Sequence, residues 1–298
     1  MALKNVIIIG AGGHLGPSIL SAFRNDPRFN VSVLSRQSST STFPEDVKVH
    51  RVGDDYPDDE VLSAFKGQDA VVSTIATASA GQQTRLIDLA IKAGVKRFIP
   101  SEFGSDTRHP NAMAILPQYF GGKNASVDYL IEKEKDGLTW SSFVTGPFFE
   151  LAMAGFMGFD IPNRKAIIYN DGEGSWSTTT MPSIGLAVKN SLLEPEKTAN
   201  RYIYTASFTV KQNDVLKVLE KITNKKFDVD YVDAEAQKVI GIEKVSKGDF
   251  SGAMLLIRYI NSVNGNGGNY ALYHPTDNEL LSLPKEDIEE VLTRIVEK

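Results

Sequence analysis

The sequence predicts an α/β fold built on a doubly wound parallel sheet. Short β-branched runs alternate with helical periodicity through the first half, a glycine-rich turn joins the first run to the first helical segment, and 42% of the 298 residues are hydrophobic. This alternation predicts helices on both faces of the sheet, and the right-handedness of crossovers between parallel strands limits its topology. The expected strands are 6–9, 31–34, 47–52, 70–74, 98–100 and 140–144, and the expected helices are 15–24, 59–65, 82–93 and 124–135.

The turn 10–16 follows the first apolar strand and opens into the first helix, with the sequence Gly-Ala-Gly-Gly-His-Leu-Gly. Its first glycine permits a tight bend, a middle glycine lets the backbone approach a pyrophosphate, and the last allows close packing of helix on strand. The first-turn amides then face the phosphates, with the positive end of the helix dipole behind them. A Rossmann-type dinucleotide site is therefore expected, and a purely structural turn is the alternative. The expected contacts are Gly10, Gly12, Gly13, His14, Leu15 and Gly16.

The second strand, 31–34, ends in Ser35-Arg36-Gln37-Ser38, where no carboxylate stands. A site for NAD usually carries Asp or Glu there to hold the ribose hydroxyls, whereas a site for NADP places a cation near the 2′-phosphate. The planar guanidinium of Arg36 matches phosphate oxygens in pairs. We therefore expect NADP(H) as the cofactor and Arg36 as the 2′-phosphate clamp; a solvated loop residue is the alternative.

The ends of the later strands supply the rest of the site, because ligands bind outside the carboxyl ends of the strands in such a sheet. The segment after the fourth strand is expected to pass the ribose on the nicotinamide side. For the two adjacent phenylalanines after the sixth strand, packing in the core is the alternative. The expected cofactor contacts are Ser73, Thr74, Ile75, Ser101, Phe103, Lys123, Gly146, Phe148 and Phe149.

The second half loses the regular alternation after residue 146. Residues 1–150 are expected to form the NADP-binding domain and residues 151–298 a smaller α/β lobe that binds substrate, with interleaving of the two left open. A strand over 166–169, a turn over 170–174 and a returning strand over 176–180 are expected first. Further strands are expected at 202–204 and 227–232, and helices at 183–193, 213–223, 234–245, 250–260 and 285–296.

Composition limits the classes of partner. The net charge of −5 gives no general affinity for nucleic acid or an anionic membrane, so a small molecule is the expected partner of a monomer or homodimer. The chain has no cysteine, and its four histidines, at 14, 50, 109 and 274, lack ligand spacing, so no metal site is expected. The chain enters a strand pattern at once, without a signal-type or membrane-length apolar run, so a cytoplasmic protein is expected.

Two further segments carry a family resemblance. They are Lys-Arg-Phe-Ile-Pro-Ser-Glu-Phe-Gly, residues 96–104, and Tyr-Phe-Gly-Gly-Lys, residues 119–123. With the turn 10–16 and Arg36, and with the strand and turn at 168–172, they resemble the NmrA-like and isoflavone reductase-like atypical short-chain dehydrogenases. That group includes the phenylcoumaran benzylic ether reductases and pinoresinol-lariciresinol reductases. The resemblance implies that Lys123 is the general acid or base and that an aromatic after the sixth strand lies near the nicotinamide.

Lys123 is expected to open a helix, where a cation opposes the helix dipole unless something else is gained. Partial desolvation beside a cofactor could tune its proton affinity for transfer to a substrate oxygen; an exposed lysine is the alternative. Tyr119 has the Tyr-x-x-x-Lys spacing of ordinary short-chain dehydrogenases, with Ser101 as a possible third member. Because Gly121 and Gly122 should break the helix between them, the catalytic role of Tyr119 is left open against pocket wall or core packing.

The resemblance implies an NADPH-dependent reductase of an aromatic or conjugated secondary metabolite, acting on a C=C, quinone methide, C=O or C=N group. Retention of Lys123 favours this over the alternative, a nonenzymatic NADP sensor that binds a partner protein. An epimerase or dehydratase is a third hypothesis, which predicts no net oxidation of the cofactor. Glu102 is expected to be a structural hydrogen-bonding carboxylate.

Overall fold

The computed structural model describes residues 3–76 and 81–297. Its main sheet has seven strands in the order β10-β6-β5-β4-β1-β2-β3, and every neighbouring pair is parallel. The predicted Rossmann-type α/β class is therefore confirmed. The strands are β1 (Asn5–Ile9), β2 (Asn30–Arg36), β3 (Lys48–Val52), β4 (Ala70–Ser73), β5 (Arg97–Ile99), β6 (Thr139–Val144) and β10 (Arg201–Tyr204).

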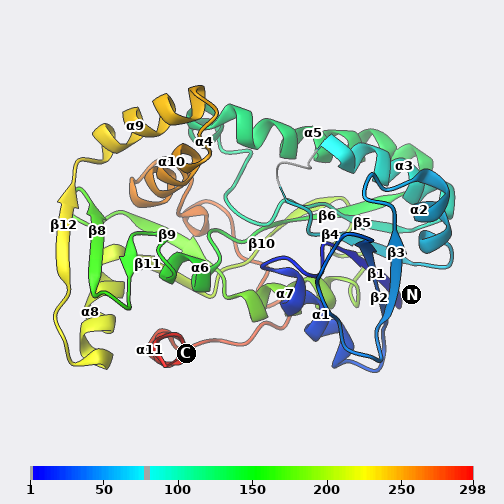
Figure 1. Ribbon diagram of the computed structural model, residues 1–298, viewed down its shortest axis with the longest axis horizontal. Helices are drawn as coiled ribbons and strands as arrows, with labels where there is room; N and C mark the ends of the chain where they lie inside the picture. The colour runs from blue at the N-terminus through cyan, green and yellow to red at the C-terminus, as the bar shows by residue number, and fades with distance from the viewer. Residues whose placement is uncertain (1–2, 77–80, 298) are drawn as a thin grey trace.

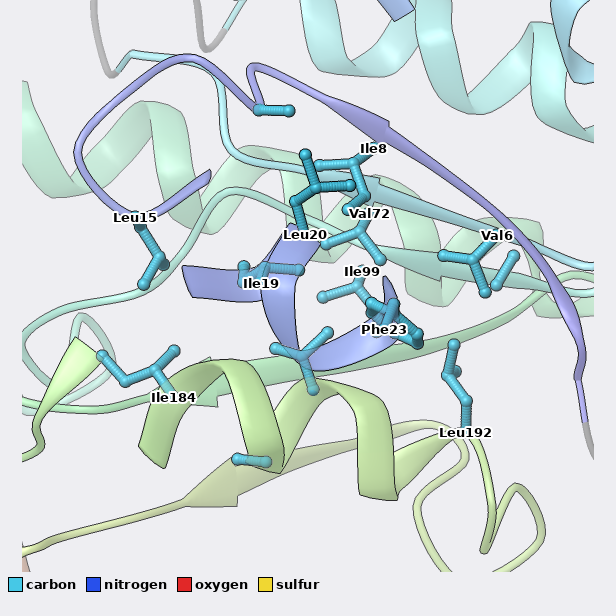
Figure 2. Close-up of a cluster of buried hydrophobic side chains, with 14 of the residues drawn as sticks. Val6, Ile8, Leu15, Ile19, Leu20, Phe23, Val72, Ile99, Ile184 and Leu192 are labelled. Carbon is cyan, nitrogen blue, oxygen red and sulfur yellow. The ribbon is translucent and has the colours of Figure 1, made fainter. Parts of the chain in front are cut away.

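Helices cover both faces of this sheet (Figure 1). One face carries α2 (Asp58–Phe65), α3 (Gln83–Ala93) and α5 (Pro117–Lys133), and the other carries α1 (Gly16–Arg24) and α7 (Met181–Ser191). Both faces are apolar because fully buried parallel strands point successive side chains to opposite layers. Figure 2 shows the face covered by α1 and α7, where Ile19 and Phe23 of α1 and Ile184 of α7 belong to one buried cluster with residues of the strands.

Gly185 lets α7 approach α1 closely. A Cβ at this position would lie 2.5 Å from the carbonyl oxygen of Ser18. We expect Gly185→Ala to lower the free energy of unfolding by about 1 kcal/mol, because overpacking costs about 1–3 kcal/mol and alanine recovers only about 1 kcal/mol of helix propensity. Gly121→Ala is the matched control, since its Cβ would meet only the Met113 methyl at 3.8 Å. Urea unfolding that gave both variants the same midpoint would contradict this account of the α1–α7 contact.

Two elements from the second half of the chain belong to this layered structure. Strand β10 pairs with β6, and α7 packs on α1. The chain therefore passes out of the main sheet and back into it. The division at residue 150, with or without interleaving of the two parts, stays a prediction.

The remaining elements extend beyond the carboxyl ends of the main strands (Figure 1). A third buried cluster, centred on Trp176, Phe159 and Leu219, holds most of them together. Two small sheets form there, with orders β12-β8-β7 and β11-β9. The elements are α4 (Pro110–Ile115), α6 (Phe149–Met153), β7 (Phe159–Asp160), β8 (Lys165–Tyr169), β9 (Ser175–Thr178), β11 (Phe208–Lys211), α8 (Gln212–Thr223), β12 (Asp228–Val232), α9 (Ala234–Ser246), α10 (Ser251–Ser262) and α11 (Ile288–Val296).

The expected return of strand 176–180 along strand 166–169 is wrong. Strand β9 pairs antiparallel with β11, while β8 pairs with β7 and β12. The turn does form, with Asn170 and Gly172 at positive φ, but Gly174 then passes against the backbone of Ser262, where a Cβ would lie 1.7 Å from the carbonyl oxygen. Because that contact leads the chain past the end of α10, β9 meets a strand that the turn signal could not identify.

Candidate active site

The glycine-rich turn has no room for side chains at its two ends. Gly10 has a φ of +82°, and a Cβ there would lie 2.7 Å from the carbonyl oxygen of Thr74. A Cβ on Gly16 would lie 2.4 Å from the carbonyl carbon of Ala11. Gly13 closes the turn, because its amide donates to the carbonyl oxygen of Gly10 at 2.9 Å. The backbone of β1 can therefore turn tightly, and α1 can begin directly against the turn.

The start of α1 presents unpartnered amides. The N–H groups of His14, Leu15 and Gly16 make no hydrogen bond within residues 3–76 and 81–297, and no side chain caps the helix. The side chain of His14 is exposed, whereas that of Leu15 is buried in the core. Free amides at a helix N-terminus, aligned with the positive end of the helix dipole, suit a phosphate. The turn therefore fits the pyrophosphate of a dinucleotide.

A groove runs from this turn past the end of β2. Its volume is about 950 Å³, including the part that is open to solvent. Its lining includes Gly10, Gly12 and Gly13 of the turn, Arg36 and Asp54. Arg36 is exposed at the end of β2. Hydrogen bonds from Ser38 and, more weakly, the charge of Arg36 lower the pKa of Asp54. The groove thus presents the cation expected for a 2′-phosphate, together with a carboxylate that the sequence interpretation did not include.

Arg51 holds the loop after β2, which lines this groove, and this role was not predicted. Its guanidinium donates to the hydroxyl of Ser35 and to the carbonyl oxygens of Arg36, Ser39 and Ser41, at 3.0 to 3.1 Å. These bonds tie β3 to the loop that follows β2. Its position within a strand pattern gives no sign of that role, because the partners come from an adjacent strand and loop.

Side-chain hydrogen bonds join the end of β4 to β1 and the end of β5 to β4. Thr74 lines the groove and donates its hydroxyl to the carbonyl oxygen of Ile9 at 2.8 Å. Ser101 donates its hydroxyl to the carbonyl oxygen of Ile75, another groove residue, at 2.7 Å. The Ser101 amide donates to Gln83 of α3, which sequence reasoning missed. Ser73 is fully buried and does not line the groove.

A second cavity, of about 630 Å³ including its open part, lies at the ends of β5 and β6. Among its described lining residues only Lys123 carries a charge, and most of the others are aromatic or aliphatic. Phe103, Gly146 and Phe148 were predicted. Leu151 of α6 was missed, and so was Ile257, which reaches the cavity from the distant helix α10. The lining is Phe103, Gly104, Ser105, Tyr119, Phe120, Lys123, Gly146, Pro147, Phe148, Leu151, Phe156 and Ile257.

Phe148 and Phe149 have different surroundings. Phe148 lines the cavity. Phe149 is fully buried in the third cluster, with its ring centroid 4.9 Å from that of Phe208. Core packing, the alternative stated for this pair, therefore describes Phe149, because it begins α6 and faces β11 instead of the cavity.

Helix α5 corrects two expectations. It runs without a break from Pro117 to Lys133, so Gly121 and Gly122 do not interrupt it. Two glycines cost a helix about 2 kcal/mol relative to alanine, but Phe120, only 2% exposed, packs against α10 in a buried cluster that offsets this cost. Lys123 consequently lies in the second turn and does not open the helix. Tyr119 and Lys123 stand one turn apart on the same side of α5, and both line the cavity.

Lys123 is buried, with 8% of its surface exposed. Its Nζ donates to the main-chain carbonyl oxygen of Glu102. Burial lowers the pKa of Lys123 from its ordinary value, and the negative charge of Glu102 opposes that shift. A lysine so placed can give up and regain a proton more readily than an exposed one.

Tyr119 also lines a neighbouring cavity of about 650 Å³, counted to its mouth, between α5 and the loop that joins α9 to α10. Phe250, whose ring is exposed, also lines this neighbouring cavity.

The described residues contain no group of three or more acidic or histidine side chains suited to a metal ion. Within the same residues, no helix is both long enough and apolar enough to cross a bilayer.

A parallel sheet with a glycine-rich turn after β1 and open cavities at its carboxyl end defines an α/β protein of the Rossmann type. The chain belongs to the NmrA-like family, whose model matches residues 2–292. It is 52% identical over 296 residues to an oxidoreductase, aprR, of Aspergillus flavus, covering 99% of each chain.

Two further comparisons extend this relationship. The chain is 31% identical over 263 residues to the phenylcoumaran benzylic ether reductase POP1 of Populus trichocarpa, covering 83% of each. A solved structure described as AtPrR2 with NADP+ and (+)pinoresinol has a TM-score of 0.75 with this chain, at 22% identity and over 99% of both. These likenesses agree with the resemblance seen in the sequence motifs, which is thereby confirmed.

Proposed function

We propose that this chain is an NADPH-dependent reductase of a conjugated or aromatic small molecule. The observation that carries the proposal is the buried amine of Lys123 in a mainly apolar cavity, at the same carboxyl end of the sheet as the glycine-rich groove. The relatives named oxidoreductase and phenylcoumaran benzylic ether reductase support it. So does the similar fold solved with NADP+ and pinoresinol.

The residues of the groove divide the binding of NADPH among them. The free amides at the start of α1 receive the pyrophosphate, and Arg36 pairs with the 2′-phosphate. Thr74 and Ile75 lie on the path towards the second cavity, and Ser101 holds that segment in place. Bound NADPH supplies a hydride. Phe103 and Phe148 give an apolar wall that excludes water from the reacting atoms.

Lys123 supplies the proton that accompanies the hydride. Its ammonium form donates to a substrate oxygen or nitrogen, directly or through a water molecule, and the amine recovers a proton from solvent after turnover. The carbonyl oxygen of Glu102 fixes the position of Nζ through a hydrogen bond. We propose that the protein is a cytoplasmic enzyme of secondary metabolism and acts as a monomer or homodimer.

The test uses the purified protein, NADPH and a panel of conjugated aromatic aldehydes, ketones and quinone methides. We expect NADPH to bind and the absorbance of its reduced nicotinamide to fall when a suitable compound is added. A protein that bound NADPH but left every compound unchanged would favour the nonenzymatic sensor. Turnover of a compound without net oxidation of NADPH would favour an epimerase or dehydratase.

Tyr119→Phe tests whether the phenol shares the proton transfer. We expect kcat to fall by no more than a few fold, because Lys123 lines the same cavity and moves the proton without the phenol. Loss of a general acid typically lowers the rate by about 100-fold or more. A loss of that size in kcat, with NADPH binding unchanged, would assign the proton to Tyr119 and contradict the proposal for Lys123.

A further inference from the structure

Glu102 is a buried carboxyl group that the proposed reduction does not use. It follows β5 and is 2% exposed. One oxygen, Oε2, accepts a hydrogen bond from the hydroxyl of Thr107 at 2.8 Å. The other, Oε1, is buried and has no hydrogen-bond partner among the described residues. Burying a carboxylate with an unpartnered oxygen is unfavourable unless a nearby positive charge compensates, so this group needs a physical reason for its position.

The compensating charge is Lys123. Its Nζ is hydrogen-bonded to the main-chain oxygen of Glu102, and the carboxylate of the same residue lies beyond the 4.0 Å of a direct ion pair. Burial raises the pKa of Glu102, and the charge of Lys123 is the largest influence that opposes this. Conversely, Glu102 is the charge that opposes the effect of burial on Lys123. One residue therefore anchors the amine through its backbone and acts on its charge through its side chain.

Other charged groups around Glu102 have weaker effects. Arg108 stabilises its carboxylate, and Asp106 destabilises it. The hydroxyl of Thr107 also favours the ionised form, because it donates to Oε2. The charge of Glu102 contributes to a raised pKa of Tyr202, whose hydroxyl accepts a hydrogen bond from Arg108. Glu102 is the charge that opposes the effect of burial on the pKa of Lys123, so its removal should affect the lysine directly.

We propose that Glu102 is a positioning residue that keeps the buried amine of Lys123 protonated and directed at the cavity, with Thr107 holding the carboxylate in its charged form. This inference rests on the proposed reductase function. In an apolar cavity without a counter-charge, a lysine loses its proton near neutral pH and cannot serve as a proton donor. Glu102 thus extends the pH range over which the ammonium form persists, without contacting the substrate.

The test is Glu102→Gln, which keeps the size of the side chain and an oxygen for Thr107 but removes the charge. Because Glu102 favours the ammonium form, its loss lowers the pKa of Lys123. Activity that needs the ammonium is present below that pKa and lost above it, so the basic limb of the pH profile of kcat should move to lower pH. A shift of about one unit lowers the rate about tenfold at a pH above both limbs.

A direct readout does not need turnover. In protein with isotope-labelled lysine, the Lys123 side-chain resonance is assigned by its absence from Lys123→Arg and followed by NMR against pH. We expect it to titrate at lower pH in Glu102→Gln than in the wild type. Glu286→Gln is the matched control, because Glu286 accepts hydrogen bonds from Thr180 and Ser183. That control should leave the titration of Lys123 unchanged.

An unchanged titration in folded Glu102→Gln would overturn the inference and leave Glu102 as an anchor for the loop to Thr107. If that variant does not fold, Thr107→Val decides in its place. Loss of the hydroxyl favours the protonated carboxyl, so Lys123 should titrate at lower pH by a smaller amount, and no shift would again overturn the inference. Failure of the wild type to reduce any compound would count against the reductase proposal alone, because the NMR titration still decides the role of Glu102.

Discussion

Lys123→Met should lower kcat by about 100- to 10,000-fold while leaving the affinity for NADPH within a few fold of the wild type. The range is that of a lost general acid. Methionine has a similar length and no charge, so it takes up much of the volume of the buried lysine side chain. Steady-state kinetics measure the turnover, and calorimetric titration with NADPH measures the binding.

The control for this substitution is Lys92→Met. Lys92 lies in the last turn of α3 and is exposed, so its replacement should change neither kcat nor NADPH binding. A Lys123→Met enzyme with nearly normal kcat would remove the lysine from the mechanism. Loss of NADPH binding together with turnover would instead make Lys123 a cofactor ligand.

Arg36→Ala should weaken NADPH binding by about 10- to 100-fold and leave NADH binding unchanged. Charge-assisted hydrogen bonds contribute about 1.5–3 kcal/mol, which corresponds to that range of affinity. The carboxylate of Asp54 lines the same groove and would then face the 2′-phosphate without the neighbouring cation. Calorimetric titration with both dinucleotides measures the discrimination between them.

Arg24→Ala serves as the control, because Arg24 is exposed at the end of α1 and paired with Asp46 at 2.8 Å, and it does not line the groove. It should bind both dinucleotides as the wild type does. An equal loss of NADPH and NADH affinity in Arg36→Ala would show that Arg36 acts on the fold of the loop. Unchanged NADPH affinity would place the 2′-phosphate elsewhere.

The first six strands of the main sheet could be predicted because each is a short run that carries β-branched or aromatic residues. The places of β10 and α7 could not. Their sequences show a strand and a helix, but pairing with β6 and packing on α1 depend on contacts between residues far apart in the chain. The interleaved path is a tertiary property, and no local pattern encodes it.

Helix α5 shows how packing overrides local propensity. Gly121 and Gly122 are poor helix formers, and the expected break followed from that fact alone. The structure buries Phe120 and Leu116 against α10, and this contact stabilises the helix through the glycines. The relation of Tyr119 to Lys123 therefore depended on a partner helix that begins more than a hundred residues later.

The candidate site divides in the same way. Gly10, Arg36 and Lys123 are identifiable because each belongs to a short motif whose chemistry depends on local spacing. Gln83 and Arg51 are not, since each supports the site through hydrogen bonds to segments brought near by the fold. Phe148 faces the cavity and Phe149 faces the buried cluster because of the direction that the chain takes after β6. The sequence does not specify that direction.

Transfer of deuterium is the most direct test of the central claim. NADPH carrying deuterium at the transferring position of its nicotinamide is incubated with the protein and a reducible aromatic compound, and the product is analysed by mass spectrometry. The reductase account predicts a product that carries the deuterium, with matching loss of NADPH, and formation of that product by Lys123→Met at a rate lower by about 100-fold or more. An unlabelled product, or a labelled product formed equally by Lys123→Met, would contradict it.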